Sequence, residues 1–126
     1  MAVVNQVEKK AKMDKFSIVQ YQIVTHCFLS GIMLSSAELS CLSMLALEGE
    51  QELNSFCQKM FGNSIFKSPQ TVRNTIAKAE KNSLVIKEGK SKKKIYINPS
   101  LKIQTDGNIF LNYKFSYFCI QKSGMI

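Results

Sequence analysis

Between residues 35 and 62, apolar residues recur three and four positions apart, which is the spacing of two amphipathic helices. Ser35 and Glu38 have the spacing of a capping box, so the first helix is predicted to begin there and to end near Gly49. Gly62 closes the pattern of the second helix. The apolar face of the first is formed by Leu39, Leu42, Leu45 and Ala46, and that of the second by Leu53, Phe56, Cys57 and Met60.

A third helix is predicted over residues 68–82, because Ser68 supplies an N-cap and Pro69 a proline in the first turn. Two short apolar runs follow within residues 84–98, on either side of a lysine-rich turn, as in a pair of hairpin strands. The pattern therefore predicts a helix followed by a β-hairpin. The apolar positions of this third helix are Val72, Ile76 and Ala79.

The two ends of the chain carry weaker patterns. Residues 1–15 hold four lysines and little amphipathic order, which predicts a basic arm. Over residues 16–30 apolar side chains occur on nearly every helical face, and a short strand running into a buried helix is expected there. Residues 101–115 contain the turn signal Asp106-Gly107, which predicts a further pair of strands around it. The expected organisation is an arm, 1–15, and one α+β domain, 16–126.

The composition is that of a folded single domain. Of the 126 residues, 45% are hydrophobic and 21% charged, and no apolar run approaches the length of a membrane span. The N-terminal residues lack a secretory signal pattern, so a cytoplasmic protein without membrane partners is expected. The four cysteines are irregularly spaced and only His26 could join them at a metal, so we expect buried, reduced thiols and no metal or other cofactor.

The net charge is concentrated in residues 67–102. This segment holds ten cations against two anions, Glu80 and Glu88, and so accounts for the whole net charge of +8. A basic surface of this kind is the electrostatic footprint of a polyanion, most often nucleic acid. A solvated lysine-rich face is the alternative that charge alone leaves open.

Residues 68–101 carry the motifs of a known family. Two helices, a third after a short turn and then a basic hairpin follow one another in the order of a winged helix-turn-helix domain. The segment resembles the recognition helix and wing of winged-helix proteins from plasmid and bacteriophage replication or transcription control. That resemblance implies a small α+β domain with three or four helices, a β-hairpin wing and an extra C-terminal β segment. It rests on the helix start Ser68, Thr71 and Val72, the wing entry Leu84 to Ile86 and the wing exit Asn98-Pro99.

In such domains the third helix lies in the major groove of DNA and the wing touches a flanking backbone or minor groove. On the face opposite the apolar positions, Gln70 and Asn74 can pair with adenine, and Arg73 at its edge with guanine. The wing lysines suit phosphate, because an ammonium is a point charge without bidentate geometry. The alternatives are an ordinary polar helix face and, for Tyr96, packing within the wing. The candidate DNA-binding residues are Ser68, Gln70, Thr71, Arg73, Asn74, Lys78, Lys81, Lys90, Lys92, Lys93, Lys94 and Tyr96.

No catalytic pattern stands out, and an enzyme is not expected. Gly89-Lys90-Ser91 resembles the end of a phosphate-binding loop, but Leu84 stands where that loop needs glycine. His26 lies in apolar sequence without a nucleophile or acid at a recognisable spacing. The carboxylates are scattered, and those of Glu48, Glu50 and Glu52 are expected to solvate a loop.

Two functions remain. The first is a DNA-binding regulator of transcription or replication, with double-stranded DNA as its partner and no small-molecule substrate. Sixteen lysines against one arginine favour an AT-rich genome, such as that of a low-GC bacterium, a plasmid or a phage. The second is a structural component of a bacteriophage virion or other large assembly, which uses the fold for protein contacts. A homodimer through the apolar N-terminal segment or the C-terminal strand and tail is compatible with both.

Overall fold

The computed structural model describes residues 2–10, 13–62 and 66–118. Contacts within the chain group it into two units. Residues 14–107 form the larger unit, and the segments 1–13 and 108–126 together form the smaller one. The domain limits expected from the sequence stay a prediction.

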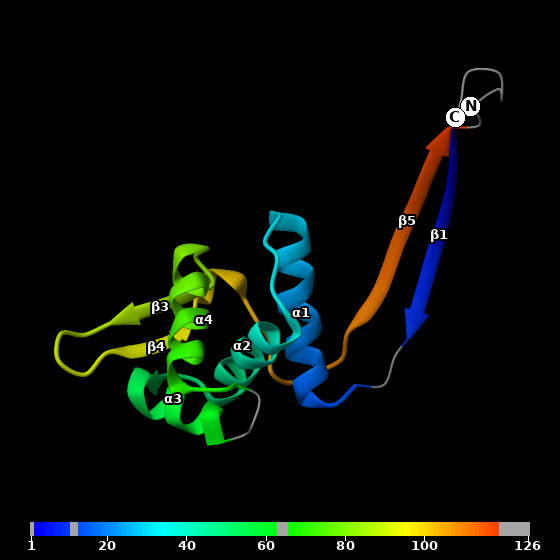
Figure 1. The fold of residues 1–126 in the computed structure, drawn as a ribbon. Helices are drawn as coiled ribbons and strands as arrows, with labels where there is room; N and C mark the ends of the chain where they lie inside the picture. The colour runs from blue at the N-terminus through cyan, green and yellow to red at the C-terminus, as the bar shows by residue number, and fades with distance from the viewer. Residues whose placement is uncertain (1, 11–12, 63–65, 119–126) are drawn as a thin grey trace. The chain divides into compact units, whose positions relative to one another are not determined.

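The larger unit combines helices with a small antiparallel sheet in the strand order β2-β4-β3 (Figure 1). The strand β2 comes from between two helices and pairs with β4, whereas β3 and β4 are the two strands of a hairpin. From α2 onward the chain runs through a helix, a strand, two helices and a β-hairpin, and the strand pairs with the edge of the hairpin. This is the topology of a winged helix-turn-helix. The elements are α1 (Lys15–Ser30), α2 (Ser36–Glu48), β2 (Gln51–Glu52), α3 (Leu53–Gly62), α4 (Pro69–Lys81), β3 (Val85–Glu88), β4 (Lys94–Ile97) and the 3-10 turn η1 (Pro99–Leu101).

The helices α2 and α4 begin where their capping side chains predict. At α2, the backbone N–H of Glu38 donates to Ser35 Oγ over 3.1 Å, and the Ser35 N–H donates to the Glu38 carboxylate over 2.8 Å. Ser68 forms the corresponding box with Thr71 at α4, where Pro69 occupies the first turn. These boxes satisfy backbone N–H groups that have no partner inside the helix.

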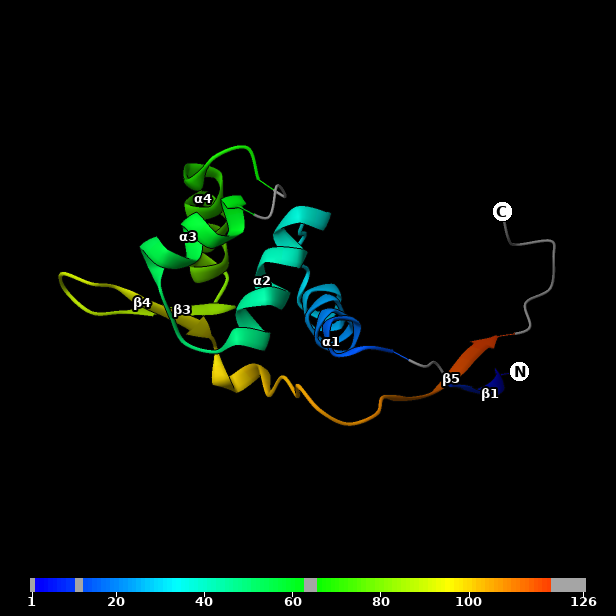
Figure 2. The same ribbon diagram turned by 90° about the horizontal axis from the view of Figure 1, so that it is seen from below.

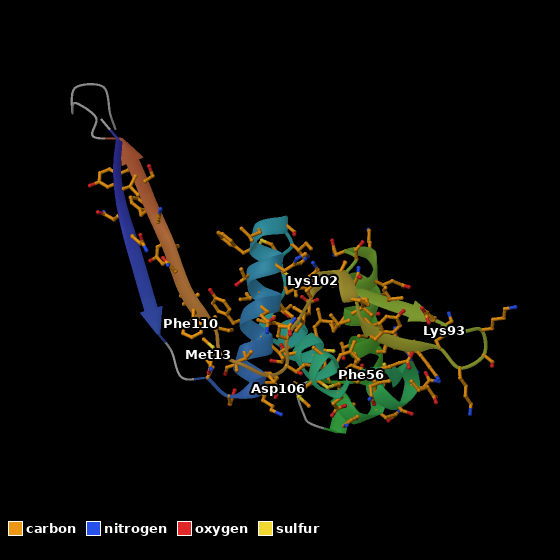
Figure 3. All side chains as sticks on the ribbon, turned by 180° about the vertical axis from the view of Figure 1, so that it is seen from behind. Met13, Phe56, Lys93, Lys102, Asp106 and Phe110 are labelled. Atoms are coloured by element: carbon orange, nitrogen blue, oxygen red, sulfur yellow. The ribbon has the colours of Figure 1, made fainter. Side chains whose placement is uncertain are left out.

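The core of the larger unit joins α1, α2, α3, α4 and the hairpin. Val72, Ile76 and Ala79 are buried, which confirms the predicted inner face of α4, and Thr75 is buried beside them. Phe56, labelled in Figure 3, is fully buried among these elements. Burying each such large apolar side chain contributes about 1.5–3 kcal/mol. Other fully buried side chains are Leu42, Leu45, Met60, Leu84 and Ile95.

Three of the four cysteines, Cys27, Cys41 and Cys57, are buried free thiols, as predicted. Burial raises the pKa of the Cys41 thiol to about 12, so it stays protonated and unreactive. Cys119 lies outside the described residues. Within the described ranges, no group of three His, Cys, Asp or Glu side chains could hold a metal ion. No described helix is both long and apolar enough to cross a membrane.

The smaller unit contains an antiparallel ribbon of two strands, β1 (Ala2–Lys10) and β5 (Phe110–Phe118) (Figure 1). Val7 pairs with Tyr113 in its register. Because successive residues of a strand alternate between its faces, Tyr113, Phe115 and Tyr117 share one face with Val7. The opposite face is mixed: there the Gln6 amide donates to Asn112 Oδ1 over 3.3 Å, and Val4 and Phe110 are exposed beside them. The ribbon therefore exposes aromatic side chains on one face and both polar and apolar side chains on the other.

The structure differs from the sequence expectations outside the central helices and hairpin. Residues 2–10, expected within an arm, form β1, and residues 16–30 belong to one continuous helix without an initial strand. Near residue 101, where a strand is expected, the chain forms η1, and Lys102 adopts a left-handed conformation. Glu52, expected in a loop, lies in β2. The strands β1 and β2 depend on partners distant in the sequence, which local spacing does not reveal.

Candidate nucleic-acid interface

The face of α4 opposite the core is exposed and largely uncharged. Gln70, Asn74 and Ala77 are exposed along it, and Lys81 is exposed at its C-terminal end. This is the face that the helical step predicts from the buried positions. The helix contacts β3, the first strand of the wing, so α4 and the hairpin adjoin within one unit.

Two amide side chains on this face are joined to each other. Gln70 Nε2 donates to Asn74 Oδ1 over 3.0 Å, one helical turn away. This bond does not use Gln70 Oε1, an acceptor, or Asn74 Nδ2, a donor, so both can bind a ligand. The exposed face of α4 thus offers one acceptor and one donor side by side.

Arg73 is half-buried at the edge of the same face. Its guanidinium donates to Asn54 Oδ1, on α3, over 2.6 Å. Because Asn54 is neutral, this bond orients the guanidinium without removing its positive charge. The role of Asn54 was missed by sequence reasoning, since the two residues are 19 positions apart and share no local motif.

The other polar residues at the start of α4 serve its cap. The Thr71 N–H donates to Ser68 Oγ over 3.3 Å, and the Thr71 hydroxyl donates to the Ser68 carbonyl over 2.5 Å. Both hydroxyls are therefore engaged in starting the helix. The sequence places Ser68 and Thr71 among the candidate DNA-binding residues, and the structure assigns them this capping contact as well.

Lys78 and Lys81 differ in their surroundings. Lys78 Nζ lies 2.9 Å from the Glu38 carboxylate on α2. Burial opposes ionisation of Glu38, but the hydrogen bonds from Ser35 and the Lys78 ammonium together hold its pKa below the ordinary value. Lys78 is therefore a neutralised cation that ties α4 to α2. Lys81 is exposed and has no ion pair within the described part of the chain.

The wing presents the densest cluster of free cations. Lys90, Lys92, Lys93 and Lys94 are all exposed, and none forms an ion pair with a described residue. Lys93 is labelled on the hairpin in Figure 3, where side chains that end in nitrogen extend outward from the turn. Four unpaired ammonium groups on a short turn create a local positive potential suited to phosphate. We name these four residues the wing lysines.

Tyr96 lies inside the wing. Its side chain is partly buried on β4, and its hydroxyl donates to the Glu88 carboxylate on β3 over 2.6 Å. This hydrogen bond, together with burial and the negative charge of Glu88, raises the pKa of Tyr96. The contact links the two strands of the hairpin, and among the described residues Glu88 forms no ion pair with a wing lysine.

The residues once considered for catalysis are dispersed. Gly89-Lys90-Ser91 forms part of the hairpin turn, with strands on both sides. His26 lies on α1. Glu48 faces Lys59 in an ion pair, and Glu52 takes part in β2.

Comparison with known proteins gives one informative result. No family model matches the sequence, and no curated protein matches it significantly. Among solved structures, the chain is similar to PerR from Streptococcus pyogenes, with a TM-score of 0.51 and 11% identity. That structure is described as the structural basis for peroxide sensing and gene regulation by PerR. The match covers 74% of this chain and 63% of that one. At this identity the likeness concerns the fold, and with the topology it defines the chain as an α+β protein of winged-helix type.

Proposed function

We propose that this protein binds double-stranded DNA through α4 and the wing and acts as a regulator of transcription or replication. The observation that carries the proposal is the group of four wing lysines without acidic partners, next to a helix whose outer face carries amides. Lys78 and Lys87, by contrast, each lie beside a carboxylate. The unpaired charge is thus concentrated where a winged helix meets DNA.

In this proposal the two parts of the site do different work. The wing lysines neutralise backbone phosphates and supply affinity without sequence preference. The acceptor of Gln70 and the donor of Asn74 match the N6 amino group and N7 of adenine in the major groove. Arg73, oriented by Asn54, would contact guanine or a nearby phosphate.

The shared fold with PerR, a protein described as acting in gene regulation, supports the regulatory role. The peroxide sensing named for that protein does not extend to the buried cysteines here, because protonated thiols react slowly with oxidants. A cytoplasmic protein of a low-GC bacterium, its plasmid or its phage fits the excess of lysine over arginine.

The test is binding of the full chain to a random pool of DNA duplexes, measured by electrophoretic shift at low and physiological salt. The wing variant replaces Lys90, Lys92, Lys93 and Lys94 by Ser. We expect the unmodified protein to select one DNA sequence and to remain bound to it at physiological salt. We expect the wing variant to lose affinity and to flatten the slope of log affinity against log salt by up to about 0.9 per lost phosphate contact.

A matched control replaces Lys9, Lys10, Lys12 and Lys114 by Ser, which removes the same net charge outside the wing. It should bind more tightly than the wing variant. If both variants lose affinity equally, binding follows net charge alone and the wing has no special role. If the unmodified chain selects no sequence, the regulator is excluded.

The exposed aromatic face of the β1–β5 ribbon favours a second candidate, a protein-binding component of a large assembly such as a phage particle. Tyr113 and Phe115 are each more than half exposed. Under this alternative the purified chain would fail to select DNA but would join its assembly, and replacing Phe115 by Ser would prevent that.

A further inference from the structure

The outer surface of α1 lacks charge. Residues 16–37 contain no Asp, Glu, Lys or Arg, although the chain has a net charge of +8. The helix α1, which takes up most of this stretch, carries apolar residues on both of its sides. A helix with almost no charge and with apolar residues on more than one side is normally covered on more than one side. One side of α1 therefore exposes apolar side chains that its sequence leads us to expect to be buried.

The inner side of α1 is accounted for by the larger unit. Ile18, Val19, Ile23 and Cys27 are buried, and α1 contacts α2. Figures 1 and 2 show that α1 flanks α2 on the side away from the β3–β4 hairpin. The other side of α1 faces no described element of this unit.

Four large apolar side chains project from that other side and from the turn that follows. Phe28 is 83% exposed, Leu29 78% and Met33 84%, and Val24 is 44% exposed. We call these four residues the α1 patch. They expose roughly 500 Å² of apolar surface together, since one large side chain offers on the order of 150–250 Å². This is near the upper end for a patch that a monomer leaves in water.

A cavity of about 350 Å³ opens beside the patch. Its lining includes Val24, Phe28 and Met33 of the patch together with Cys27, Ile32 and Leu39, and it has room for an aromatic ring. A projecting ring thus lies next to an apolar recess on the same surface. Such a surface can pair with a second copy of itself, because each copy offers both the ring and the recess.

We propose that the α1 patch is the interface of a symmetric homodimer, in which Phe28 of each copy enters the cavity of the other. Two copies would hide about 1,000 Å² of surface, which reaches the lower limit of a specific interface. Copies with a charge of +8 repel each other elsewhere, whereas no charged side chain of residues 16–37 opposes contact here. The α1 patch offers no charged or polar side chain to a partner, and a second copy of the same apolar patch can bind it without one.

The test is sedimentation velocity of the full chain over a range of concentrations, without DNA. We expect a species of twice the 14.2 kDa chain mass. Phe28→Glu and Met33→Glu, made separately, should each weaken the dimer by about 30-fold or more, as for a central interface residue. Both side chains are exposed in the monomer, so the thermal melting of each variant in its monomeric form should match the parent's.

Phe115→Glu is the matched control, because it places the same charge on the other exposed aromatic surface, the ribbon. We expect it to leave the dimer intact. A chain that is monomeric at all concentrations would overturn the proposal, as would a dimer that Phe115→Glu dissociates and Phe28→Glu does not. If the chain is monomeric and binds 1-anilinonaphthalene-8-sulfonate, and the Phe28→Glu variant does not bind it, the cavity is instead a site for small apolar molecules.

This inference goes beyond the proposed function and does not depend on it. Self-association is measured without DNA, and the wing lysines are intact in every variant. If the dimer fails, the DNA proposal stands unchanged. If both hold, Phe28→Glu should still bind a single DNA half-site but lose the advantage of two half-sites on one duplex.

Discussion

Gly89 determines the geometry of the turn that carries the wing lysines. Its φ is +103°, a conformation that L side chains rarely adopt. A Cβ at this position would lie 2.6 Å from the backbone oxygen of Lys92. Because that neighbour is backbone, no side-chain rotation relieves the contact. The display of the four lysines therefore depends on a residue without a side chain.

We expect Gly89→Ala to lower the free energy of unfolding by roughly 1–3 kcal/mol, because the turn must strain or rearrange. Urea denaturation followed by circular dichroism measures the change. Gly62→Ala is the control, since no atom lies within 4 Å of its added Cβ. That helical substitution should be neutral or stabilise by up to about 1 kcal/mol. Equal effects of the two substitutions would contradict the strained turn.

Single residues are predictable from the sequence when their signal is local. The capping residues Ser35 and Ser68 and the buried positions of α4 follow from spacings of three and four residues. The partner of Lys78 is Glu38, 40 positions earlier, and that of Arg73 is Asn54. These pairs arise only once the helices pack, so no local pattern distinguishes Lys78, which is neutralised, from Lys81, which is free.

At the scale of elements, α4 and the wing divide the proposed recognition between them. The helix presents amides, which can distinguish bases, and the hairpin presents ammonium groups, which cannot. Changes on the two elements should therefore produce different signatures in DNA binding.

We expect Asn74→Ala to reduce discrimination against a single replaced adenine by on the order of 1–3 kcal/mol, with little change in salt dependence. Lys81→Ala should instead weaken binding to all duplexes and lower the salt slope by about 1. Fluorescence anisotropy with the selected duplex and its single-base variants, at several salt concentrations, separates the two effects. If Asn74→Ala changes the salt slope alone, α4 does not read bases.

The strands show where sequence analysis of elements reaches its limit. The hairpin of β3 and β4 is visible because a short turn joins two apolar runs. The two-residue β2 exists only through pairing with β4, and Glu50 to Glu52 have no strand pattern of their own. Within residues 101–115 the pattern predicts two strands that pair around Asp106-Gly107, and this pairing is wrong. The strand β5 pairs instead with β1, about a hundred positions earlier in the sequence.

At the scale of the whole molecule, the core belongs to one unit. The buried apolar side chains of the described residues run from Ile18 to Ile95, all inside residues 14–107. The side chains of β1 and β5 whose burial the structure describes add none. An isolated two-stranded ribbon is marginally stable in water, so its presence should contribute little to the stability of the larger unit.

The fragment 14–107 is therefore expected to unfold cooperatively, with a melting temperature within about 5 °C of the full chain, a shift equivalent to roughly 1 kcal/mol. Thermal circular dichroism measures this. A fragment that begins at residue 35 and so lacks α1 is the comparison, and it should be much less stable because it loses Val19, Ile23 and Cys27 from the core. A fragment 14–107 that does not fold would show that the ribbon is part of the core.

The pairing of β1 with β5 has a consequence for the order of events during synthesis. The strand β1 is made about a hundred residues before β5, so at about 5–20 residues per second it waits roughly 5–20 s for its partner. Residues 14–107 are complete before β5 emerges and can fold in that interval. Their ends are drawn together by Lys15 with Asp106 at 3.1 Å and by the Gln22 amide, which donates to the Gln104 carbonyl over 2.7 Å. Folding of the larger unit thus shortens the loop that the ribbon must close, and the ribbon forms last.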